Sequence, residues 1–107
     1  MCAMGSVGRL NRNGMEACRR GQFEEAEEKL LAALELAQSV GGGCCTTIKI
    51  HNNLGIVCEL RGCPDRAVHH YGTALELMKA IGSGKHPLRG RLLQSLSRAA
   101  SSVSSPG

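Results

Sequence analysis

The sequence predicts an all-α protein, and three observations support that prediction. Apolar residues recur at steps of three and four along most of the 107 residues, which places them on one face of each helix. Aromatic residues make up only 2% of the chain, whereas the strands of β-sandwiches and barrels favour aromatic and β-branched residues. No stretch alternates between polar and apolar residues as a half-buried strand does. The length suits one small domain with its own core.

The first two predicted helices span about 7–20 and about 23–40, and Gly21 lies between them. In the second, an apolar stripe at steps of three and four runs from Phe23 to Val40, and four glutamates occupy the first turns. Negative charge is favourable there because the N-terminal end of a helix carries a partial positive charge. Three consecutive glycines, from residue 41 onward, then end this helix.

The third predicted helix begins near Thr46 or Thr47, either of which could cap its N-terminus, and ends near Arg61. The fourth begins at Pro64, because proline is favoured at the first helical position, and it ends near Ile81. Both boundaries therefore rest on residues with a known preference for helix ends.

A fifth helix is expected over about 87–100. The remaining residues, 101–107, are rich in serine and have little to bury, so we expect a flexible tail. Together the helices predict a single domain over 1–100.

An internal repeat relates the helices to one another. Two sets of small residues have the same spacing, namely Gly14, Gly21, Ala26 and Ala33 in the first and Gly55, Gly62, Ala67 and Ala74 in the second. The first glycine lets the partner helix approach closely, and the second lets the chain leave one helix and enter the next. The alanines keep the second helix near its neighbours, while Leu30 or Tyr71 fills the gap between them. Each helix pair would bury its apolar face by stacking on its copy.

This repeated skeleton resembles the tetratricopeptide repeat (TPR). The resemblance covers about 7–40 and about 48–81, and the fifth helix resembles the first half of a third copy or a solvating cap. The bulky aromatic residue usual at the start of the first helix is replaced by Asn11 and His51. The copies are 41 residues apart, against about 34 for the usual repeat. An extra turn on each flanking helix or a longer loop over 41–47 would account for the difference.

The resemblance implies a non-catalytic module that binds a peptide or partner protein on the concave face of the first helices of the pairs. Net charge also differs between the first and second helices of the pairs. Residues 1–20 have a net charge of +3 and residues 21–40 a net charge of −4, and residues 82–107 contain no acidic residue. A basic groove would attract an acidic or carboxylate-bearing peptide.

By resemblance, the groove residues of the inner helices are Asn11, Arg12, Met15, Arg19, Lys49, Asn52, Asn53, Ile56 and Glu59. Arg89 on the fifth helix could bind a carboxylate from the far side. Asn53 directly precedes Leu54 and Gly55, where TPR proteins often hold an asparagine that hydrogen-bonds a peptide backbone. A carboxamide suits this role because it both donates and accepts. The alternative is that these residues form only a solvated polar face.

Two further functions stay open from the sequence. Two and a half repeats would leave apolar faces at both ends, so the chain could be a self-assembly module, a homo-oligomer with no separate ligand. The chain could instead associate with nucleic acid, but a net charge of +4 is only mildly basic, which makes nucleic acid the less favoured partner.

The six cysteines and four histidines contain no Cys-x-x-Cys pair, so we expect no metal site and no cofactor. A nucleophile built from Cys63 and a nearby histidine would lack an orienting third group and an oxyanion hole, so we expect no enzymatic activity. The N-terminus lacks the apolar run of a secretory signal and no segment is long enough to span a bilayer. We therefore expect a cytoplasmic protein with reduced cysteines and no membrane partner.

Overall fold

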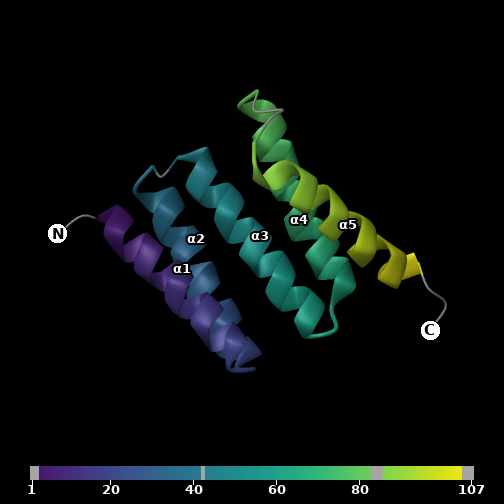
Figure 1. The fold of residues 1–107 in the computed structure, drawn as a ribbon. Coiled ribbons are helices and arrows are strands. Elements are labelled where there is room, and N and C mark those ends of the chain that lie inside the picture. Colours follow the sequence, from purple (N-terminus) through teal and green to yellow (C-terminus); the bar gives the residue numbers. More distant parts are fainter. Residues whose placement is uncertain (1–2, 42, 83–85, 105–107) are drawn as a thin grey trace.

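The computed structural model describes residues 3–41, 43–82 and 86–104. Over these residues the chain forms five α-helices of 17 residues each and no strand. In chain order the helices are α1 (Ala3–Arg19), α2 (Phe23–Ser39), α3 (Cys44–Leu60), α4 (Pro64–Ala80) and α5 (Leu88–Ser104) (Figure 1). The predicted all-α class with five helices is confirmed. None of these helices combines the length and apolar character needed to cross a membrane.

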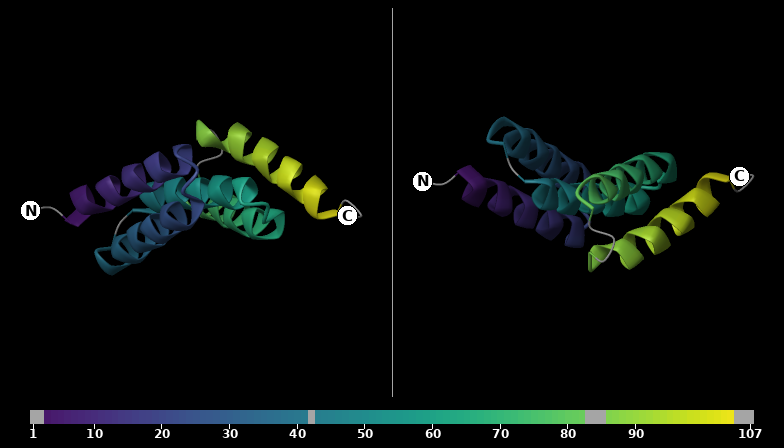
Figure 2. Two further views of the ribbon diagram at one scale, coloured as in Figure 1. Left: turned by 90° about the horizontal axis from the view of Figure 1, so that it is seen from below. Right: turned by 90° about the horizontal axis from the view of Figure 1, so that it is seen from above.

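The helices pack as two antiparallel pairs followed by a single helix. α1 packs on α2, α3 packs on α4, α2 joins the pairs by packing on α3, and α5 packs on α4. α1, α3 and α5 lie on one side of the molecule and α2 and α4 lie on the other (Figure 2). This arrangement confirms the predicted solenoid of helix pairs, with α1, α3 and α5 as its inner layer.

Longer helices, not a longer loop, accommodate the 41-residue repeat. The link between α2 and α3 is confined to residues 40–43, and α3 already begins at Cys44. The expected threonine cap near residue 46 is therefore wrong, and Gly43 is the N-cap. The Gly43 carbonyl accepts the backbone N–H groups of Thr46 and Thr47, and the Thr47 hydroxyl bonds back to it at 3.4 Å.

The two ends of the helical array also extend beyond the predicted boundaries. α1 begins at Ala3 rather than near residue 7, which places a full turn before the buried side chain of Val7. α5 continues to Ser104, so residues 101–104 belong to this helix and not to a flexible tail. The Ser102 hydroxyl bonds the carbonyl of Arg98 at 3.3 Å, a local contact that makes serine compatible with the last turn. The rest of the expected tail lies outside the described residues.

The core consists of two apolar clusters, and α3 contributes to both. Ile50, Leu54 and Val57 belong to the cluster formed with α1 and α2, whereas Ile48 and Cys58 belong to the cluster formed with α4 and α5. All five side chains are fully buried. α3 is therefore the helix through which the two repeats share one continuous interior.

A buried ion cluster fixes the outer helices relative to each other. Glu27 of α2 is only 8% exposed and accepts hydrogen bonds from Arg61, which follows α3, and from Arg66 in α4. Removing either arginine would leave a buried carboxylate less well compensated, which is costly. This cluster therefore restrains the first repeat against the second on the side away from α1 and α5.

The turn within each helix pair has the same geometry in both repeats. Gly21 has a φ of 79° and Gly62 a φ of 82°, which lie in the left-handed region that glycine adopts without strain. The N–H of Gln22 then bonds the carbonyl of Ala17 at 2.9 Å, and the equivalent bond after Gly62 measures 2.8 Å. The predicted role of the second glycine is confirmed in both copies.

The closest approach of the paired helices occurs at the first glycine of each copy. A Cβ atom on Gly14 would lie 2.9 Å from Cγ of Leu30, and one on Gly55 would lie 2.8 Å from Cζ of Tyr71. Leu30 and Tyr71 are fully buried. The four alanines of the skeleton are fully buried as well: Ala26, Ala33, Ala67 and Ala74. The two copies are thus built around the same contact.

Substitution of Gly55 by alanine should destabilise the fold by about 1–3 kcal/mol, because the added methyl group overlaps the Tyr71 ring. Gly72 in α4 is the matched control, since a Cβ there meets no atom within 4 Å. Gly72→Ala should stabilise the protein by about 0.5–1 kcal/mol through its better helix propensity. Urea denaturation followed by far-UV circular dichroism measures both free energies. Equal effects of the two substitutions would contradict the close approach at Gly55.

Candidate functional site

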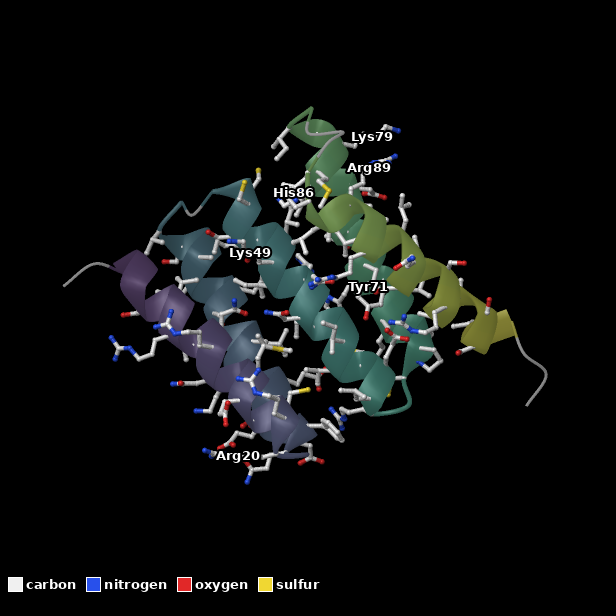
Figure 3. The ribbon with its side chains drawn as sticks, viewed as in Figure 1. Arg20, Lys49, Tyr71, Lys79, His86 and Arg89 are labelled. Carbon is white, nitrogen blue, oxygen red and sulfur yellow. The ribbon has the colours of Figure 1, made fainter. Side chains whose placement is uncertain are left out.

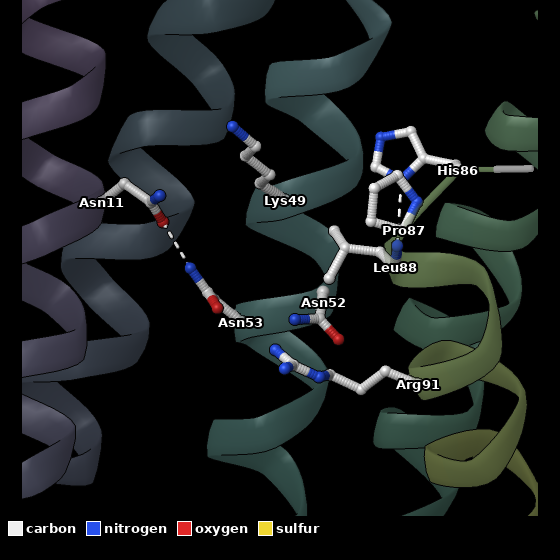
Figure 4. A pocket seen from close by; sticks show the side chains of 8 residues that line it. All are labelled: Asn11, Lys49, Asn52, Asn53, His86, Pro87, Leu88 and Arg91. Atoms are coloured by element: carbon white, nitrogen blue, oxygen red, sulfur yellow. Dashed lines mark hydrogen bonds between the residues drawn. The ribbon is translucent and has the colours of Figure 1, made fainter.

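The concave surface holds two adjoining cavities between the inner helices. The larger has a volume of about 510 Å³ and is lined by Asn11, Lys49, Asn52, Asn53, His86, Pro87, Leu88 and Arg91 (Figure 4). The second has a volume of about 470 Å³ and is lined by Asn11, Arg12, Asn13, Met15, Glu16, Arg19 and Asn53. Because Asn11 and Asn53 line both, the two cavities form one groove, which runs from α1 across α3 to α5.

Asn11 and Asn53 join the two cavities through a direct contact. The amide nitrogen of Asn53 donates to the side-chain oxygen of Asn11 at 2.9 Å, although the residues are 42 positions apart (Figure 4). The bond links α1 to α3, whose backbones come close at only a few residues. It orients the Asn53 carbonyl oxygen and the Asn11 amide nitrogen so that each can make a further hydrogen bond.

Asn52 is a buried polar group that faces the larger cavity. Its side chain is 6% exposed, and its Oδ1 atom has no hydrogen-bond partner among the described residues. An unsatisfied buried acceptor costs about 1–3 kcal/mol, so a donor supplied by a bound molecule would be stabilising. Figure 4 shows Arg91 reaching from α5 toward Asn52, which places a cation beside this acceptor. The cavity therefore offers both an acceptor and a positive charge.

The two halves of the groove differ in available charge. Lys49 and Arg91, at the larger cavity, are both exposed. Arg19, at the smaller cavity, donates to Glu16 through Nη2 at 2.7 Å, and this bond lowers the pKa of the Glu16 carboxyl. An anionic molecule would therefore find more uncompensated positive charge at the larger cavity.

The structure brings together seven of the ten residues expected in the groove, since all except Ile56, Glu59 and Arg89 line one of the two cavities. Ile56 is half-buried against the second core cluster. Arg89 is exposed, and in the view of Figure 3 it lies at the edge of the molecule. Two positions along a helix turn the side chain by about 200°, so Arg91 faces the groove where Arg89 does not.

Glu59, also expected in the groove, is occupied by contacts within the protein. Its carboxylate accepts bonds from Arg98 at 2.8 and 2.9 Å and from the Tyr71 hydroxyl at 2.6 Å. The bond from Arg98 is the largest cause of the lowered pKa of Glu59. Burial, together with Glu59, raises the pKa of Tyr71. This network links α5 to α3 and α4.

Three groove residues missed by the sequence analysis precede or begin α5. These residues are His86, Pro87 and Leu88. The backbone N–H of Leu88 donates to Nδ1 of His86 at 3.1 Å, so the histidine caps the helix and is held at the cavity. The sequence signal for this role is the position of His86 two residues before the start of α5. A side chain there can reach a backbone N–H group that has no partner within the helix.

Comparisons with known proteins agree with this arrangement. Residues 46–104, which include most of α3 and all of α4 and α5, match the family model described as the tetratricopeptide repeat. Among solved structures, the chain is similar to the TPR domain of Arabidopsis FLU, with a TM-score of 0.75 and 19% sequence identity. That similarity covers 95% of this chain and 92% of the other, and at this identity it concerns the fold. No curated protein sequence gives a significant match.

A histidine pair lies between α3 and α4, away from the groove. Nδ1 of His51 and Nδ1 of His70 are 3.1 Å apart, so at least one ring must be neutral for one nitrogen to donate to the other. Burial lowers the pKa of both, and for His70 it acts with the charges of His51, His69 and Arg66 to bring the pKa to about 4. In the described residues, no three His, Cys, Asp or Glu side chains are grouped to hold a metal ion.

Acidification should destabilise the fold through this pair. The unfolded chain takes up a proton on His70 near its ordinary pKa of 6.5, whereas the folded protein does so only near 4. The unfolded state therefore binds more protons between these values, so stability is full above pH 6.5 and falls as the pH decreases toward 4. We expect a loss of about 1–2 kcal/mol, reduced by the partial solvent exposure of His70.

Urea denaturation at about pH 7 and about pH 4.5 measures this loss. His70→Gln should lose less stability on acidification than the unmodified chain. The neighbouring His69, which is exposed, provides the control, and His69→Gln should retain most of the pH dependence. A pH dependence that His70→Gln leaves unchanged would show that the pair is not its source.

Proposed function

Because this chain belongs to the tetratricopeptide repeat family, whose members are in general protein-interaction modules, we propose that it binds an extended segment of a partner protein in its groove. The groove between α1, α3 and α5 is the site of binding. The observation that carries this proposal is the unpartnered, buried acceptor of Asn52 beside the Asn11–Asn53 pair. The carboxamides of Asn11, Asn52 and Asn53 offer donors and acceptors at neighbouring points of the groove.

A peptide backbone in an extended conformation matches that pattern. Each residue other than proline carries one N–H donor and one carbonyl acceptor, and in an extended segment both are available to a partner. A helical segment uses most of these groups within itself. The Asn52 oxygen would accept a backbone N–H, while Asn53 and Asn11 would contact adjacent backbone groups.

The charge of the larger cavity favours an acidic segment. Lys49 and Arg91 flank Asn52, and α5 carries no acidic residue. Positive charge in a groove speeds the approach of an anionic partner and disfavours a basic one. Specificity for acidic side chains would therefore come from Lys49 and Arg91, and affinity for the backbone from the asparagines.

The proposed role is non-catalytic. The described residues that line the two cavities are amides, cations and apolar side chains, together with Glu16 and His86. Glu16 is bonded to Arg19 and His86 caps α5, so each of these titratable groups already has a structural role. Such a lining suits reversible binding.

Selection from a random linear peptide display library, followed by fluorescence anisotropy of the selected peptides, tests the proposal. We expect the selected sequences to be enriched in aspartate and glutamate. Asn53→Ala should lower their affinity about 5- to 30-fold, which corresponds to the loss of hydrogen bonds worth about 1–2 kcal/mol.

Arg91→Ala and Arg89→Ala are a matched pair of variants that tests whether Arg91 contributes to the binding of acidic peptides. Arg91→Ala should weaken binding, and Arg89→Ala should not, since only Arg91 lines the groove. A peptide whose affinity is insensitive to Asn53→Ala and Arg91→Ala would refute the groove as the binding site. Preferential binding of a single-stranded oligonucleotide, with affinity that falls steeply as salt rises, would instead favour the nucleic-acid alternative.

A further inference from the structure

The turn between α3 and α4 holds a cysteine on each side of its glycine. Cys58 lies in the last turn of α3, and Cys63 is the N-cap of α4. The corresponding residues of the first repeat, 41 positions earlier, are Ala17 and Gln22. The same backbone bond closes both turns, at 2.9 Å in the first repeat and 2.8 Å in the second. The geometry of the turn therefore does not require the two cysteines.

This backbone bond holds the two cysteines within the range of a disulfide. The N–H of Cys63 donates to the carbonyl of Cys58 at 2.8 Å. A Cα atom lies about 2.4 Å from its own carbonyl oxygen and about 1.5 Å from its own nitrogen, so the bond limits the Cα–Cα distance to at most about 6.7 Å. Disulfides usually join Cα atoms that are about 4.4–6.8 Å apart. The folded turn therefore places both residues at a separation that a disulfide can bridge.

The two side chains also share one environment. Cys58 is fully buried in the second core cluster, and Cys63 packs against that cluster. Both are free thiols. Arg66 lies near both of them, since Glu27 raises the pKa of Arg66 and negative charge on either thiol adds to this effect. The two cysteines are thus neighbours through their side chains as well as through their backbone.

The two thiols differ in their access to solvent. Cys63 is partly exposed, whereas Cys58 is fully buried. Burial raises the pKa of the Cys58 thiol, which keeps this thiol protonated at neutral pH. An oxidant that arrives from solvent therefore meets Cys63 first and finds Cys58 behind it. An accessible thiol next to a second, resolving thiol is typical of reversible redox sites.

We propose that Cys58 and Cys63 form a reversible disulfide that closes the α3–α4 turn when the chain meets a hydroperoxide. The sulfur of Cys63 attacks the outer oxygen of the hydroperoxide, and the O–O bond breaks. The thiol proton leaves with the other oxygen as an alcohol, or as water from hydrogen peroxide, and Cys63 becomes a sulfenic acid. The sulfur of Cys58 then attacks the sulfur of Cys63, the S–O bond breaks, and the hydroxyl group leaves with the Cys58 proton as water. Two electrons pass from the thiols to the hydroperoxide, and a dithiol reductant returns them.

Mass spectrometry of the full chain after treatment with hydrogen peroxide tests this disulfide. To prevent links between chains, serine replaces three other cysteines: Cys2, Cys44 and Cys45. Remaining thiols are blocked with N-ethylmaleimide, and trypsin then cleaves after Arg61. Residues 50–61 and 62–66 should be recovered as one linked species, lighter by two hydrogens than the two peptides together, and dithiothreitol should separate them. Recovery of both peptides in blocked form, with no linked species, would overturn the proposal.

Two further variants test the order of the reaction. Cys63→Ser should leave Cys58 unoxidised at the same dose of peroxide, because Cys58 is buried. Cys18→Ala should still form the link, since Cys18 is buried in the other core cluster. Oxidation of Cys58 in Cys63→Ser would show that Cys63 is not the thiol that reacts first, and would contradict the proposed step.

Urea denaturation of the oxidised and reduced chains tests whether the folded turn favours the bond. The oxidised chain should unfold at a higher urea concentration, because the bond constrains the unfolded state. A lower midpoint for the oxidised chain would show that the native turn opposes the bond, which would overturn the proposal. Asn53→Ala should form the disulfide normally, so a failure of peptide binding and a failure of this redox site are distinguishable.

Discussion

The contact between a glycine of the inner helix and a large side chain of the outer helix is the constraint on which the structure depends. At the contacts of Gly14 with Leu30 and of Gly55 with Tyr71, the two helices of each pair are so close that even a Cβ atom on the glycine would not fit. This approach fixes the angle of each pair, and the pairs can then stack through the shared faces of α3. The concave surface is a consequence, because α1, α3 and α5 are held on one side of the molecule, where polar residues of these helices line the groove.

α3 both packs in the two core clusters and lines the groove. Two of its faces are buried in different core clusters, and its remaining face carries Lys49, Asn52 and Asn53 into the groove. Its last turn holds Glu59, which anchors α5. Because α3 is so fully packed, the proposed binding of a flexible segment would need little reorganisation of the groove, which would reduce its entropic cost.

The sequence predicts the features that depend on local residue patterns. It cannot predict the features that depend on how distant segments pack together. Helix number, pairing and glycine roles follow from spacing that is repeated within the chain. The choice of Arg91 over Arg89 depends on the rotation of α5 about its axis, which the packing of Leu92 and Ala99 decides. The arginine partners of Glu27 and Glu59 lie 34 to 39 positions away, so no local signal identifies them. Cys44 carries no helix-start preference, which explains the late start expected for α3.

Nuclear Overhauser effects between Gly55 and Tyr71 are the most direct test of the glycine contacts that hold the helix pairs. Tyr71 is the only tyrosine of the chain, so its ring resonances can be assigned without ambiguity. We expect strong effects between the α-protons of Gly55 and the ring protons of Tyr71, matched by effects between Gly14 and the methyl groups of Leu30. Absence of both from a folded, fully assigned sample would show that the helix pairs are not held by these contacts.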